Sequence, residues 1–242
     1  RGAHDQVVLG RQQLAFGHLE RFLRLVERNL VARPVQRQAG RQGRALAVGV
    51  AVACHAAVAA GDGLAGQAPQ DILGALSWQP GWVWSLYGPL VQHALRQPYP
   101  LLAANLERRE IMQIYAQVPQ LQGPASTAQS VREALFGQIR ESHCNLLPDS
   151  QLPAMLAVQQ QRDRRMAEAL LAAPEPSLLF AGAFHVRREL GVPLHLQDLG
   201  ATEGVQVLIL AEVGSQVAAQ SADYVWFTAA QPEQDHCAKL RP

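Results

Sequence analysis

Short apolar runs alternate with longer amphipathic segments along this chain, and this alternation constrains its fold more than any other feature. The run 45-ALAVGVAV-52 has no polar side chain, which is typical of a central parallel strand buried on both faces. Segment 16–33 instead repeats apolar residues at helical spacing. The pattern predicts an α/β fold in which helices flank a layered, mostly parallel central sheet. The expected strands are 6–10, 45–52, 101–106, 177–182, 192–196, 205–213 and 223–228, and the expected helices are 16–33, one near 69, and 150–173.

The composition fits a single globular domain spanning residues 1–242. With 48% hydrophobic and 17% charged residues, the chain can bury a core that does not depend on disulfides or bound metals for stability. A formal net charge of +1 provides no basic field for nucleic acid, so we expect no nucleic-acid partner. No apolar run approaches the length that a membrane-spanning helix requires.

Polar side chains follow three of the expected strands. In parallel α/β sheets, ligands bind beyond the carboxyl ends of the strands, so these groups could converge on one cleft. They could equally be ordinary solvated loop residues. The groups are residues 10–13, Asn105 with Arg108 and Arg109, and His185 with Arg187 and Arg188.

Segment 78–97 is the most aromatic part of the chain. Core packing accounts for its tryptophans, but the phenol of Tyr87 must find a partner if it is buried. Gly88 and Pro89 follow directly, and we expect them to break or begin a helix there and to expose the Tyr87 ring in a pocket. A phenolate oxygen is one of the known ligand types for haem iron.

The cysteines and the catalytic motifs constrain function mainly by what they exclude. Cys54, Cys144 and Cys237 show no CxxC spacing, so we expect no structural zinc site. One disulfide with a leftover thiol can form in an oxidising compartment, and the spacing leaves the pairing open. No HExxH, GxSxG or P-loop pattern occurs. His195 falls in the expected strand 192–196, where a hydrogen-bonded structural histidine is the usual case.

Several stretches in a consistent order carry a family resemblance along nearly the whole chain. The most specific is 178-LLFAGAFHVRRELGVPLHL-196, followed by 82-WVWSLYGPLVQHA-94. The others are 7-VVLG-10, 102-LAANLERR-109, 163-DRRMAEAL-170 and 223-DYVWFT-228. Together they resemble the ChaN-like haem-binding lipoproteins of bacterial iron uptake, which implies a single ChaN-like α/β domain.

The ChaN-like family that this chain resembles is related in fold to metal-dependent hydrolases of the erythromycin-esterase and Tiki type. Those enzymes share a Gly-Glu-x-His element after the first strand, where this chain has Arg11 and Gln13. The glutamate that commonly follows the second strand is also absent from 48-VGVAVACHAA-57. A guanidinium repels a divalent cation, so we expect no catalytic residues and no metallohydrolase activity. A hydrolase with His185 as its base is the alternative.

The resemblance implies haem (iron protoporphyrin IX) as the cofactor, with a tyrosine as the iron ligand. Tyr87 matches because it lies in the W-x-x-Y-x-P-L run, and His185 is the competing ligand. Arg187 and Arg188 suit haem propionates, although these neighbours are expected to face different ways or to cap the local fold. The remaining candidates are the aromatic walls Trp82 and Trp84, with Leu90, and His93, which does not share the face of Tyr87.

The resemblance also implies partners and a location. We expect a homodimer, formed with or without haem, that contacts the haem-uptake machinery. The expected location is the bacterial periplasm or outer membrane, through a lipid anchor outside the residues of this chain. A degenerate member that binds neither haem nor metal, and serves as a binding partner, is the remaining alternative.

Overall fold

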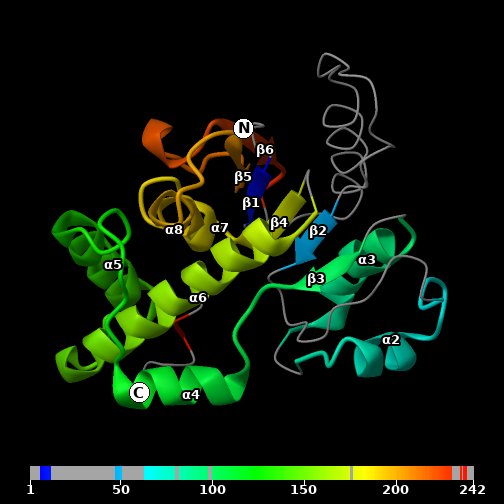
Figure 1. Ribbon diagram of the computed structural model, residues 1–242, viewed down its shortest axis with the longest axis horizontal. Coiled ribbons are helices and arrows are strands. Elements are labelled where there is room, and N and C mark those ends of the chain that lie inside the picture. The colour runs from blue at the N-terminus through cyan, green and yellow to red at the C-terminus, as the bar shows by residue number, and fades with distance from the viewer. Residues whose placement is uncertain are drawn as a thin grey trace.

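The strands of the protein form one six-stranded sheet in the computed structural model, which describes residues 6–11, 47–50, 63–79, 82–97, 100–174, 177–230, 235 and 237–238 (Figure 1). The strand order is β3-β2-β4-β1-β5-β6, and each described pairing is parallel. The predicted α/β layering and parallel sheet are therefore confirmed. The strands are β1 (Gln6–Arg11), β2 (Ala47–Val50), β3 (Leu101–Ala103), β4 (Ser177–Gly182), β5 (Val205–Glu212) and β6 (Tyr224–Thr228).

The longest described helix, α6, runs diagonally across Figure 1 and reaches the sheet near β4, and α4 and α5 pack against it. The helices are α2 (Pro69–Ala75), α3 (Trp84–Leu95), α4 (Arg108–Gln117), α5 (Gln129–Ser142), α6 (Leu152–Ala172), α7 (Ala183–Val186) and α8 (Val192–Asp198), with short 3-10 turns η1 (Asp149–Gln151) and η2 (Ala219–Ser221). The predicted helix 16–33 lies outside the described residues. Among the helices that the structure describes, none combines the length and apolarity needed to cross a membrane.

Alternating side chains of β4 build two separate cores. Leu178 and Phe180 pack with α2 and α3, whereas Leu179 and Ala181 pack with α6 and α8. Because successive side chains of a strand point to opposite faces, α3 and α6 cover opposite faces of the sheet. Any two side chains that belong to these separate cores approach the sheet from different sides.

The prediction of a strand at 192–196 is wrong, because these residues begin α8. Val192, His195 and Leu196 are buried, and their spacing is that of one helical face rather than of an alternating strand. Pro193 occupies the first turn of the helix, where its missing amide costs no helical hydrogen bond. His195 is therefore a buried helical residue and not a strand residue.

The expected break at Gly88-Pro89 is also absent, since α3 continues through both residues. Pro89 removes one helical hydrogen bond, but the residues that follow it, Leu90, Val91 and Ala94, are buried against the core, and this packing outweighs the local penalty. A side chain on Gly88 would overlap the Trp84 indole, so the glycine allows that ring to lie against the helix.

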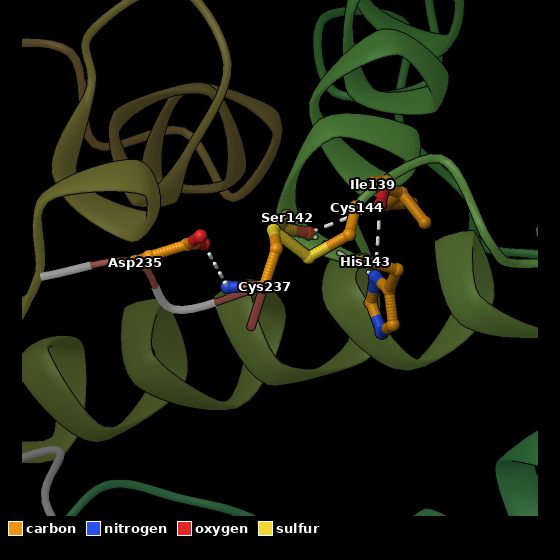
Figure 2. Close-up of a disulfide and its surroundings, with 6 residues drawn as sticks. All are labelled: Ile139, Ser142, His143, Cys144, Asp235 and Cys237. Carbon is orange, nitrogen blue, oxygen red and sulfur yellow. Dashed lines mark hydrogen bonds between the residues drawn. A yellow bond between two sulfur atoms is a disulfide. The ribbon is translucent and has the colours of Figure 1, made fainter. Parts of the chain in front are cut away.

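One disulfide joins Cys144, just beyond the end of α5, to Cys237 near the C-terminal end of the chain (Figure 2). The two Cα atoms are 5.8 Å apart. Its pairing was left open by the sequence, and Cys54 lies outside the described residues. Beside it, the Asp235 carboxylate accepts a hydrogen bond from the Cys237 amide, and His143 Nδ1 lies 2.8 Å from the Ile139 carbonyl oxygen (Figure 2).

Candidate functional site

His185 lies on the short helix α7, which begins directly after the carboxyl end of β4. Its Nδ1 atom is 2.5 Å from Oδ1 of Asp163 on α6. The Asp163 side chain is fully buried at 0% exposure, whereas the His185 side chain is 18% exposed. The pair therefore joins the end of β4 to α6, and its imidazole is the member that reaches solvent.

Gln159, a second side chain of α6, also contacts the pair formed by His185 and Asp163. Gln159 Nε2 lies 3.1 Å from His185 Nδ1 and 3.4 Å from Asp163 Oδ2. The Nδ1 atom cannot donate a proton to Asp163 and accept one from Gln159 at the same time. The compatible assignment has Nδ1–H donating to Asp163 and the Gln159 amide donating to the same carboxylate.

Arg187 and Arg188 lie on the turn after α7, and each is engaged with an acidic side chain of this chain. Arg187 pairs with Glu189, which also accepts a hydrogen bond from Ser221 at 2.9 Å. Arg188 pairs with Asp223, whose carboxylate accepts the Val207 amide at 2.7 Å. These contacts tie the turn to β5 and to the start of β6. They favour capping of the local fold over contact with haem propionates.

Tyr87 lies on α3 within a half-buried aromatic cluster. Its ring makes an edge contact with Trp82, at a centroid distance of 5.0 Å, and a tilted contact with Trp78 at 6.5 Å. Trp84 meets Trp78 edge-on at 5.0 Å. These rings pack against the core beneath α2 and α3.

The structure does not bring the two candidate iron ligands together. Tyr87 packs on the α3 face of the sheet, whereas His185 contacts α6 on the opposite face. His93 lies six residues after Tyr87 on α3, where Gln97 Nε2 donates to the His93 carbonyl oxygen at 3.3 Å. Arg108 and Arg109 at the start of α4 border a shallow hollow together with Met112. The side chain of Arg11 and the whole of Gln13 lie outside the described part.

A second buried network lies beside the site, at the other end of α8. Asp198 accepts hydrogen bonds from the Ala125 amide at 2.8 Å and from the Ser126 amide and hydroxyl at 2.9 and 2.5 Å. Arg164 of α6 lies 3.8 Å from the same carboxylate and donates to His195 Nδ1 at 3.4 Å. The network fastens the loop before α5 to α6 and α8.

Two pKa values in this network are displaced. Burial lowers the pKa of His195 to about 4, although the charge of Asp163 opposes this change. Burial alone would raise the pKa of Asp198, but the hydrogen bonds from Ser126 and Ala125, with the charge of Arg164, bring it below its ordinary value. His195 is consequently neutral in the fold at physiological pH, as the hydrogen bond that its Nδ1 accepts from Arg164 requires.

We expect His195 to make the fold sensitive to mild acid. The unfolded chain binds a proton near pH 6.5, whereas folded His195 stays neutral down to about pH 4, so stability is lost as the pH falls through this window. The loss is at most about 3 kcal/mol. Urea unfolding of the wild type and of His195→Gln, near neutral pH and near pH 4, measures it. The variant should show a smaller acid-induced loss, and equal losses in both proteins would contradict this role.

Sequence reasoning missed Asp163 and Gln159, the two partners of His185. Their spacing of four residues places them on one face of a helix, and Asp163 opens the family-like stretch 163-DRRMAEAL-170. Nothing in the spacing joined them to His185, because that contact depends on how α6 packs against β4.

Comparisons with known proteins bear on what this site does. A family model described as haem-binding uptake, Tiki superfamily, ChaN, matches residues 53–196, which is more than half of the chain. The chain belongs to this family. As a ChaN-family protein it is also similar in structure to ChaN of Campylobacter jejuni, which is described as binding haem cofacially, with a TM-score of 0.74 and 26% sequence identity. The similarity covers 92% of this chain and 87% of the Campylobacter protein. No curated protein matches significantly.

The residues of this ChaN-family chain fit haem. A half-buried cluster of three tryptophans around Tyr87 offers apolar surface and a phenol, and His185 offers an imidazole that reaches solvent. Within the described part of the chain, no three His, Cys, Asp or Glu side chains come together to hold a bare metal ion.

Proposed function

We propose that this chain binds haem and holds it for haem or iron uptake at the bacterial cell envelope. The observation that carries the proposal is the family match over residues 53–196, and the likeness to the Campylobacter haem-binding protein supports it. Haem binding needs an iron ligand and apolar surface, and it needs neither the acid nor the imidazole that Arg11 and Gln13 replace. The proposed role is non-catalytic.

Two side chains could each supply a ligand to the haem iron. Tyr87 would donate its phenolate oxygen from within the aromatic cluster, with Trp82 and Trp84 as flat neighbours. His185 would donate an imidazole nitrogen from the carboxyl end of β4. Since they lie on opposite faces of the sheet, a haem that met both would lie between two copies of the chain. This geometry, and the cofacial haem of the Campylobacter protein, support a homodimer that forms around haem.

A location outside the cytoplasm is supported by the disulfide between Cys144 and Cys237. Such bonds persist in oxidising compartments and are rare where glutathione keeps thiols reduced. The periplasm, or the outer membrane with attachment through a lipid anchor, satisfies this condition. Haem-uptake machinery in the same compartment would be the physiological partner.

Visible spectra of hemin-loaded variants test the proposal and identify the ligand. Hemin should give the wild type a shifted Soret band that saturates, and loss of the ligand should change that spectrum. Tyr87→Phe is compared with the control Tyr115→Phe on α4, and His185→Gln with the control His143→Gln beside the disulfide.

A spectrum changed only in Tyr87→Phe assigns the phenolate, and one changed only in His185→Gln assigns the imidazole. Both variants matching the wild type would exclude this pair of ligands. A wild type without any Soret shift would refute haem binding and leave a binding partner without haem as the function.

A further inference from the structure

We propose that Asp163 is a positioning residue that holds the His185 ring so that its Nε2 atom meets a ligand arriving across Gly182. The inference rests on the proposed function in one respect only, namely that the ligand is haem. The orientation of the ring is a property of the chain by itself. The proposed orientation and the proposed haem binding can therefore fail independently of each other.

The burial of Asp163 is the first support. Its carboxylate is fully buried, and among the described residues its ion-pair partner is His185. Gln159 adds a longer contact from the same helix. A buried carboxylate is costly to desolvate, and a well-packed apolar side chain would often stabilise a fold as well or better. The presence of a buried acid at this position is explained if its contact orients a functional group.

The tautomer follows from this contact. A carboxylate at 2.5 Å accepts the proton of Nδ1, which leaves the lone pair on Nε2. Histidines that bind metals commonly donate their other N–H to a carboxylate in this way, and the contact fixes the ring and increases its basicity. No hydrogen-bond partner reaches Nε2 from the described residues.

The second support is the residue beside the open edge of the ring. Gly182 is exposed and has φ −62° and ψ 147°, a conformation that any residue adopts, so the backbone does not require glycine here. A Cβ at this position would meet only Cδ2 of His185, at 3.5 Å. Cδ2 is bonded to Nε2. The absence of a side chain on Gly182 therefore leaves space next to Nε2, the atom that the contact with Asp163 turns outward.

The orientation is tested first in the protein without haem. Nitrogen-15 NMR of labelled histidines, at alkaline pH where imidazoles are neutral, should show His185 protonated at Nδ1. In Asp163→Leu the nearest polar group is the Gln159 amide, which would donate to Nδ1 and move the proton to Nε2. His143, whose Nδ1 faces a backbone carbonyl, is the internal control and should not change. Protonation of His185 at Nε2 in the wild type overturns the proposal without any variant.

Hemin titration then tests the consequence for binding. Asp163→Leu should bind hemin about 10- to 100-fold more weakly, as is typical when the partner of a ligand histidine is removed. Gly182→Leu should also weaken binding while the His185 tautomer and the apo stability remain those of the wild type. A folded Asp163→Leu with wild-type affinity, or Gly182→Leu with wild-type affinity, overturns the proposal. If the wild type binds no hemin, the proposed function fails, and the NMR result still decides the role of Asp163.

Discussion

Replacing Asp198 by alanine should destabilise the protein by about 3–5 kcal/mol, one of the largest effects expected of any single side chain. The side chain is 1% exposed, and its carboxylate accepts three hydrogen bonds from Ala125 and Ser126. Truncation leaves two backbone amides and a hydroxyl without their acceptor, and it leaves the Arg164 guanidinium without its carboxylate. Chemical unfolding near neutral pH, where the Asp198 carboxylate is ionised, measures the loss.

A surface aspartate provides the matched control. Asp149 also pairs with an arginine, Arg140, at 3.0 Å, but its side chain is 83% exposed. Exposed ion pairs contribute between zero and about 1 kcal/mol, so Asp149→Ala should change stability little. Equal losses in the two variants would show that the buried network does not fasten the loop before α5.

Gly191→Ala should cost about 3 kcal/mol and weaken hemin binding as well. A Cβ at this position would overlap the carbonyl oxygen and carbon of His185 and would lie 3.3 Å from the carbonyl oxygen of Arg187. These are backbone atoms, so no change of rotamer relieves the overlap. Relief requires α7 to move, and His185 moves with it. Thermal unfolding and hemin titration of the same preparation measure both effects.

Gly137→Ala is the control for this substitution. Gly137 lies within α5, and an added Cβ would meet no atom within 4 Å. Alanine is the better helix former by about 1 kcal/mol, so this variant should be slightly more stable than the wild type. A Gly191→Ala protein that unfolds like the wild type would show that the turn after α7 can shift without cost.

The sheet was readable from the sequence because its strands are short apolar runs. β4 is buried on both faces and β5 nearly so, and the alternation of strands with helices predicted parallel pairing. The segment 192–196 was misread because its five residues are too few to separate a period of two from a helical face. Val192 and Leu196 are buried in the core beneath α6, and His195 is buried as well, which favours the helix over the strand.

The candidate site was only partly readable. The end of the apolar run at Ala181 and Gly182 located His185, and the aromatic segment located Tyr87. Their separation by the sheet depends on which face each helix covers, and residue spacing does not encode this. The partners of Arg188 and His185 lie 35 and 22 residues away, so those contacts required the packed fold. The pair between Arg187 and Glu189 is local by comparison, because only two positions separate the residues.

Titration of the wild-type protein with hemin, followed at the Soret band, decides whether this chain binds haem. Haem binding predicts a shifted band that saturates at a fixed ratio of hemin to chain. A linear increase with the spectrum of free hemin, and no saturation, would contradict it.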